Sequence, residues 1–222
     1  MKVTMYVYKA ELVTHSIMWF NTSSYPHSRG YVQKILPVIH NYPLTLAFLG
    51  HIVDGSYVGA YNAPHYRDLQ EVYKETGLYV FPAVFERTFH MRLTMSMGES
   101  DYILYKPQTR WAVPLMTTNN VLAPGSKAVS YVISDKPLNV NYIRVGVKRG
   151  IVRVSLQEVK NYKEVKDIHP NVAYNVKDVT ASNYFVLLKH RAGDVGFSGD
   201  VKRGLSFEEQ GEVVYLPLPD FI

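Results

Sequence analysis

His40 and Tyr42 are the first residues of this 222-residue chain whose types could do chemistry. A histidine of near-neutral pKa can move a proton, and a nearby lysine can stabilise the charge that develops on phosphorus, so such a group could cleave RNA without a metal. The competing interpretation is structural: His40 precedes a helix and Tyr42 belongs to the core. Because catalytic geometry is not visible in a sequence, both interpretations stay open here.

Other catalytic chemistry has no support in the sequence. The chain contains no GxxxxGK[ST] phosphate loop, no HExxH zinc motif and no GxSxG nucleophile elbow. Cysteine is absent, and the eight histidines lack the close spacing of metal ligands. We therefore expect neither a cofactor nor a metal.

Positive charge is concentrated in residues 127–166, which hold nine basic and three acidic residues for a net charge of +6. The whole chain carries +5, and residues 204–222 hold four acidic residues and no basic one. A basic block beside an acidic end favours a polyanion on one face of the protein and a basic protein on another. An ordinary solvated surface is the alternative.

The centre of the basic block has the pattern of a β-hairpin. A two-residue turn at Arg149-Gly150 would sort the apolar residues onto one side of both strands. Arg144, Lys148 and Arg153 would then share the other side, with Arg149 at the tip. Basic side chains neutralise phosphates, so this side is a candidate surface for a sugar–phosphate chain.

Aromatic residues are interleaved with basic ones elsewhere in the chain, which contains 18 tyrosines. Arg110 precedes Trp111, and Tyr142 lies two residues before Arg144. Rings stack on unpaired bases at about 1–3 kcal/mol each, so Trp111 and Tyr42 are candidate stacking residues. The octapeptide of RNA-recognition sheets is absent, so we expect contacts from hairpins and loops instead.

The elements that must position these residues are mostly strands. In residues 85–97 the odd positions are apolar except Arg87, and the even positions are polar and include His90 and Arg92. This period of two predicts one long strand with a polar face toward water or a partner. Further strands are expected over 3–13, 184–189 and 212–216, and loops over 21–30, 108–126 and 193–204.

Two helices are expected, one from Asn41 to Gly50 and one from Pro64 to Gly77, on their capping residues and apolar spacing. The first lies in residues 35–53, which contain no Asp, Glu, Lys or Arg and are nominally long enough to span a bilayer. Prolines and polar residues in that stretch favour a buried helix. We expect no membrane association and a cytoplasmic location, in keeping with the absence of cysteine.

Three segments, in the same order along the chain, resemble one protein family. They are HNYPLTLAFLG at 40–50, LAPGS at 122–126 followed by YVIS at 131–134, and YIRVG at 142–146 followed by VRV at 152–154. Together they resemble the small Cas-five-type subunit, the Csc-one group, of type I-D CRISPR effector complexes.

The resemblance implies an α+β fold, with a ferredoxin-like or RRM-like antiparallel sheet, an inserted loop or hairpin and additional C-terminal β structure. The chain would be a single RAMP-like domain over 1–222. Within it, residues 1–110 would form the core, 111–135 an inserted loop and 136–222 a β-rich C-terminal part.

The resemblance also implies a non-catalytic subunit of the surveillance complex in antiviral defence. It would bind the 5′ handle of the CRISPR RNA (crRNA) and cap the backbone beside the large subunit. Expected partners are the crRNA handle, the repeated backbone subunit, the large subunit and target DNA near the PAM. The candidate RNA-binding residues are Arg144, Lys148, Arg149, Arg153, His90, Arg92, Tyr42, His40, Arg110, Trp111, Asn120 and Lys127.

Two alternatives stay open. A related Cas-five subtype cleaves precursor RNA, so the chain could be a metal-independent endoribonuclease that processes precursor crRNA with His40 and Tyr42. It could instead be a protein-interaction module without RNA contact, in which the basic block pairs with an acidic partner.

Overall fold

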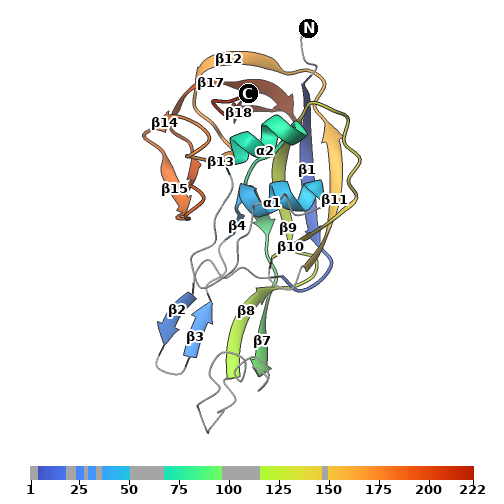
Figure 1. The fold of residues 1–222 in the computed structure, drawn as a ribbon, viewed down its shortest axis with the longest axis vertical. Coiled ribbons are helices and arrows are strands. Elements are labelled where there is room, and N and C mark those ends of the chain that lie inside the picture. The colour runs from blue at the N-terminus through green and yellow to red at the C-terminus, as the bar shows by residue number, and fades with distance from the viewer. Residues whose placement is uncertain are drawn as a thin grey trace.

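The computed structural model describes residues 5–18, 24–27, 30–33, 37–50, 68–96, 116–146 and 150–222. This part of the chain is mostly β-structure with two short helices, α1 (Asn41–Leu49) and α2 (Leu69–Thr76) (Figure 1). The strands are, in chain order, β1 (Tyr6–Thr14), β2 (Ser24–His27), β3 (Gly30–Gln33), β4 (Val38–Ile39), β5 (Leu78–Val80), β6 (Ala83–Arg87), β7 (His90–Ser96), β8 (Met116–Leu122), β9 (Lys127–Ser134), β10 (Tyr142–Val145), β11 (Gly150–Glu158), β12 (Lys163–Ile168), β13 (Ala173–Asn175), β14 (Ala181–Ser182), β15 (Phe185–Leu188), β16 (Val195–Phe197), β17 (Asp200–Glu209) and β18 (Glu212–Pro217).

The largest sheet has the strand order β10-β11-β1-β9-β6-β4, and β5 also pairs with β9. The expected N-terminal strand is confirmed as β1, which pairs antiparallel with β9 on one edge and β11 on the other. Successive side chains of a strand point to opposite faces, so β1 divides the core in two. Ala10 and Leu12 pack with Leu44 of α1, whereas Val7 belongs to the cluster on the other face.

The expected first helix is confirmed as α1, and α2 forms the second half of the other expected helix. Gly50 and Gly77 end them with left-handed φ values of +71° and +68°, as their positions predicted. The N-caps differ from the expectation. The side chains of His40 and Asp68 accept the hydrogen bonds at the two N-termini, from Tyr42 N and Gln70 N.

Two smaller sheets form the C-terminal part. One has the order β12-β17-β14 with β18 paired to β17, and the other has the order β13-β16-β15. Leu205 and Leu216 from the first of these sheets pack in one cluster with Val7 of β1. The additional C-terminal β structure is therefore present, and the strands expected over 184–189 and 212–216 are confirmed as β15 and β18.

Three segments expected to be loops contain strands instead. Residues 21–30 include β2, which pairs with β3; residues 108–126 include β8, which pairs with β7; residues 193–204 include β16 and the start of β17. Residues 111–135 include β8 and β9, and β9 lies within the largest sheet between β1 and β6. The division of the chain into core, insert and C-terminal part remains a prediction.

The long strand expected over 85–97 is two strands, β6 and β7, which belong to different sheets. The pair β7–β8 projects beyond the largest sheet, on the side away from α2 (Figure 1). Phe85 is buried, but Phe89 and Met91 on the same alternation are exposed. A polar–apolar alternation predicts the strand but does not place a core behind it.

Among the described residues no helix is both long and apolar enough to cross a membrane. The uncharged segment 35–53 contributes α1, and the side chains of Leu44 and Phe48 in that helix are buried.

Candidate nucleic-acid interface

The hairpin β10–β11 presents two different sides. Ile143 and Val152 are a directly opposed pair on the buried side, whereas Arg144 and Arg153 are exposed on the other. The sequence pattern predicted this sorting, and it is confirmed.

The register of the hairpin was predicted incorrectly. Arg144 pairs with Ile151, not with Ser155, because β10 ends at Val145 and β11 begins at Gly150. Gly146 leaves β10 with φ +80°, while Gly150, expected in the turn, is buried with its Cα close to Ile17 O. A shift by an even number of residues keeps each side chain on its own face, so the alternation fixed the faces without fixing the partner.

Register places basic residues from separate strands in one row across the sheet. Val13 of β1 pairs with Arg153 on one side and with Lys127 on the other. The row continues outward to Tyr142 beyond Arg153 and to Arg87 beyond Lys127. Directly opposed residues lie on the same side of a sheet, and four strand spacings make this row about 19 Å long along the sheet.

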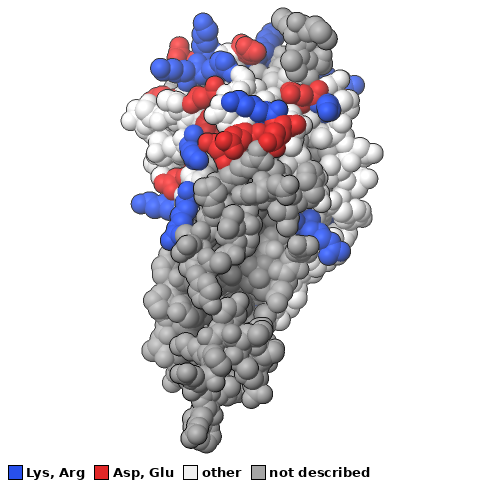
Figure 2. All heavy atoms as spheres, viewed as in Figure 1, with Lys and Arg blue, Asp and Glu red and all other residues white. Residues whose placement is uncertain are grey.

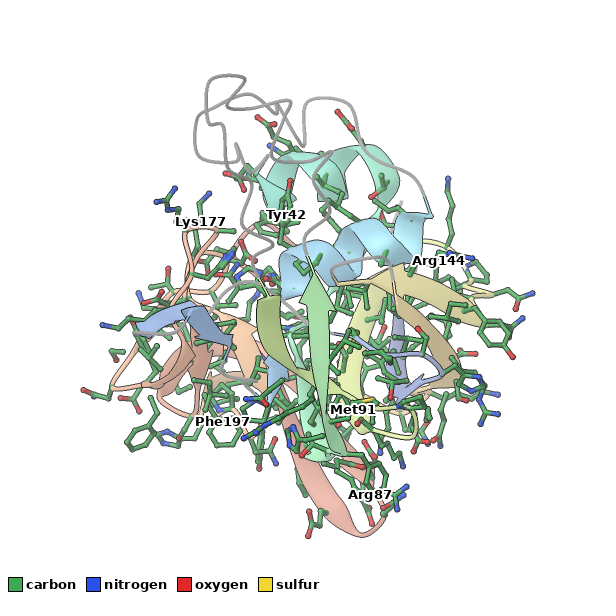
Figure 3. All side chains as sticks on the ribbon, turned by 90° about the horizontal axis from the view of Figure 1, so that it is seen from below. Tyr42, Arg87, Met91, Arg144, Lys177 and Phe197 are labelled. Atoms are coloured by element: carbon green, nitrogen blue, oxygen red, sulfur yellow. The ribbon has the colours of Figure 1, made fainter. Side chains whose placement is uncertain are left out.

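We call Arg87, Lys127, Arg144 and Arg153 the basic face. Figure 3 shows Arg87 and Arg144 at the periphery of the molecule, directed away from its body. Acidic side chains gather elsewhere, over α2 (Figure 2). The sheet therefore offers one strongly positive side that is separate from the acidic one.

The members of the basic face differ in how their charge is balanced. Lys127 Nζ lies 3.2 Å from Glu11 Oε1 and 3.7 Å from Glu86 Oε2. Arg144 and Arg153 are exposed and form no ion pair with any described residue. Since an ion pair with a neighbouring carboxylate competes with a phosphate, the two arginines are better placed than Lys127 to bind one.

The finger formed by β7 and β8 carries three more predicted residues. Arg92 of β7 is directly opposite Asn120 of β8, and His90 is exposed with Nε2 2.9 Å from Thr88 Oγ1. Arg87 connects this finger to the sheet, because its guanidinium carbon lies 5.1 Å above the ring centre of the exposed Phe89.

Arg87 is a residue that sequence reasoning missed. It was the single basic exception on the odd, apolar side of the long expected strand. The signal was therefore present, but its meaning depended on where β6 ends, which the alternation does not show. In the structure it pairs with Lys127 at the last position of β6.

His40 and Tyr42 are buried, with 4% and 6% of their surface exposed. His40 Nδ1 accepts a hydrogen bond from Tyr42 N (3.1 Å), and Nε2 lies 2.9 Å from Gly193 O. Burial lowers the pKa of His40 to about 4, and the ring packs 4.6 Å from that of His190. Both ring nitrogens thus hold the protein's own backbone, and the prediction that these two residues contact RNA is corrected to a structural role.

A buried polar cluster adjoins His40 at the start of α1. Asp178 Oδ2 accepts hydrogen bonds from Asn41 Nδ2 (2.9 Å) and Tyr79 OH (2.8 Å), and Asn175 Nδ2 donates to Asn41 Oδ1 (3.1 Å). Burial raises the pKa of Asp178 to about 6 and that of Tyr79 well above its usual value. These bonds fasten α1 to the C-terminal part of the chain.

Four predicted residues, Lys148, Arg149, Arg110 and Trp111, lie outside the described residues. Within the residues that are described, no group of three or more His, Asp and Glu side chains is placed to hold a metal ion.

Comparison with solved structures gives two similar folds at low identity. One is the crystal structure of a CRISPR protein from Archaeoglobus fulgidus, with 11% identity, a TM-score of 0.38 and coverage of 96% of this chain and 100% of that chain. The other is a chain in the cryo-EM structure of Type III-B Cmr-beta bound to cognate target RNA and AMPPnP, with 13% identity, a TM-score of 0.35 and coverage of 93% and 86%. No curated protein matches the sequence.

Comparison with protein families gives a match to the type I-D CRISPR-associated protein Cas5/Csc1 over residues 5–191. This match spans most of the chain and includes the three segments on which the resemblance was based. The chain therefore belongs to the Cas5/Csc1 family of type I-D CRISPR systems.

Proposed function

We propose that this Cas5/Csc1 subunit binds the 5′ handle of the crRNA on its basic face. The observation that carries the proposal is the row in which Arg153, Lys127 and Arg87 meet across the largest sheet. Phosphates bind to such a face through charge, and exposed rings such as Tyr142 and Phe89 beside it can stack on unpaired bases.

A salt titration of handle RNA tests this proposal. The variant Arg144→Ala/Lys148→Ala/Arg153→Ala should bind the RNA more weakly, and its affinity should depend less steeply on salt, because each lost phosphate contact removes about 0.7 from the logarithmic slope for single strands. The matched control is Lys163→Ala/Lys166→Ala/Lys202→Ala, which removes the same charge from exposed residues of β12 and β17. Equal affinity and slope in the first variant and the wild type would remove the proposal.

We infer that the subunit is not an enzyme. The endoribonuclease alternative relied on His40 and Tyr42, and the ring nitrogens of His40 are both hydrogen-bonded to backbone groups. Repeat RNA incubated with the protein in EDTA should stay intact. Specific cleavage that is lost in His40→Ala would instead support the endoribonuclease.

The wider role proposed here follows from family membership. The subunit would cap the backbone of repeated subunits beside the large subunit, near the PAM of target DNA, in a cytoplasmic antiviral complex. The antiparallel sheet with α1 against one face would be the ferredoxin-like core of a single RAMP-like domain. Co-purification of the complex with a discrete short RNA would support this role, and a complex without RNA would favour a module that binds protein alone.

A further inference from the structure

The strand β15 is an open edge with apolar side chains. Within the described part of the chain its sole hydrogen-bonded neighbour is β16. Phe185, Val186 and Leu187 are 71%, 42% and 37% exposed, in direct succession. Since successive side chains of a strand point to opposite faces, both faces of this edge are apolar.

Other C-terminal edges are protected against pairing. Along β18 the side chain of Asn171 donates to Val213 O and accepts from Tyr215 N, both at 2.8 Å, and so occupies the backbone groups of that edge. The edge strand β12 carries exposed charges at Lys163, Glu164 and Lys166. Charges and side-chain covers are the usual devices that keep an edge from adding another strand, and β15 has neither within its four residues.

Charge near β15 identifies the kind of partner. Lys189 and Arg191 follow the strand, are exposed and form no ion pair with a described residue. The neighbouring acids are already engaged: Asp194 Oδ1 accepts from His190 N (3.0 Å), and Asp200 Oδ2 accepts from Asn183 Nδ2 (2.8 Å). A second copy of this edge would bring the same positive charges, whereas an acidic segment would complement them.

We propose that β15 receives an extended, acidic segment of a neighbouring protein subunit, which adds to the β13-β16-β15 sheet as a further strand. Backbone hydrogen bonds would supply affinity, and pockets beside Phe185 and Val186 would select apolar side chains. Lys189 and Arg191 would pair with acidic residues beyond the end of the added strand. The inference rests on the proposed role as a subunit of an effector complex, but not on RNA binding by the basic face.

The test is assembly with the other subunits of the type I-D complex, co-expressed with the full chain and crRNA. The variant Phe185→Asp/Val186→Asp places two negative charges on the edge, and its incorporation into the complex should fall about tenfold or more. The matched control is Val213→Asp/Tyr215→Asp on β18, where the same exposed apolar types lie beside an edge that Asn171 already covers. This control should assemble like the wild type.

Hydrogen exchange in the wild-type protein gives a second readout that needs no variant. The amides of 185–188 should exchange about tenfold more slowly in the complex than in the free chain. Unchanged exchange, or full incorporation of Phe185→Asp/Val186→Asp, overturns the inference. A variant that assembles normally but loses affinity for handle RNA would instead assign this edge to nucleic acid. Failure of the RNA proposal is separate, because it appears in the isolated chain through Arg144 and Arg153.

Discussion

Arg153 of β11 and Lys127 of β9 lie in one row of the largest sheet because both pair with Val13, one from each side of β1. Two strand spacings, about 10 Å, separate their backbones. Arg87 extends the row on the far side of Lys127. Basic residues that are far apart in the chain should therefore act on the same ligand.

Replacing Arg87 tests whether this row acts as one surface. Arg87→Ala should weaken handle-RNA binding about threefold to tenfold and lower the salt slope by about 0.7, since one phosphate contact is lost. Titrations at several salt concentrations measure both quantities. Lys166→Ala on β12 is the control, because it removes one exposed positive charge from another sheet. If Arg87→Ala binds like this control, the row does not reach as far as β6.

Replacing Glu11 should have the opposite effect. Its carboxylate lies 3.2 Å from Lys127 Nζ on the basic face, so Glu11→Gln removes a competitor for that ammonium group. We expect a rise in RNA affinity of about twofold to fivefold. Glu212→Gln, at the exposed start of β18, makes the same change of charge elsewhere and should have little effect. A fall in affinity with Glu11→Gln would mean that Glu11 positions Lys127 for binding.

The faces of the hairpin β10–β11 could be predicted from the sequence, but its partners could not. Alternation of Ile143, Val145, Val152 and Val154 sets which side is buried. Every even shift of register satisfies the same alternation, so the choice between Ser155 and Ile151 opposite Arg144 depends on the turn. The cationic side was therefore predictable from local pattern alone.

The row across the sheet could not be predicted, because it depends on pairing between distant strands. Nothing near Val13 in the sequence indicates that Arg153 and Lys127 are its neighbours. The burial of His40 has the same origin: its Nε2 partner, Gly193, belongs to the C-terminal part of the chain. Local signals gave the helix that follows His40, and long-range packing decided the role of its side chain.

Replacing His40 should affect stability and leave RNA chemistry unchanged. His40→Ala removes the N-cap of α1 and the contact with Gly193 O, which should lower the free energy of unfolding by about 1–2 kcal/mol. Denaturant titration measures this loss. His40→Asn supplies another capping side chain and should recover part of the stability. Equal stability of His40→Ala and wild type would contradict the capping role.

The pH dependence of stability separates His40 from Asp178, because burial shifts the two pKa values in opposite directions. The pKa of His40 falls from 6.5 to about 4, so the unfolded chain takes up this proton first and stability is lost as the pH falls from 6.5 to 4. The pKa of Asp178 rises from 3.8 to about 6, so the folded chain holds this proton longer and stability is lost as the pH rises from 4 to 6. Between pH 4 and 6 the two contributions oppose each other.

Asp178→Asn should remove one side of this balance. The amide oxygen can still accept hydrogen bonds from Tyr79 and Asn41, but the group no longer titrates. Relative to wild type, the free energy of unfolding of Asp178→Asn should therefore increase as the pH rises from 4 to 6, by an amount on the order of 3 kcal/mol. His40→Gln should give the reverse trend relative to wild type in the same window. Denaturant titrations at pH 4, 5, 6 and 7 measure both, and parallel curves for Asp178→Asn and wild type would mean that the buried carboxyl titrates at its ordinary pKa.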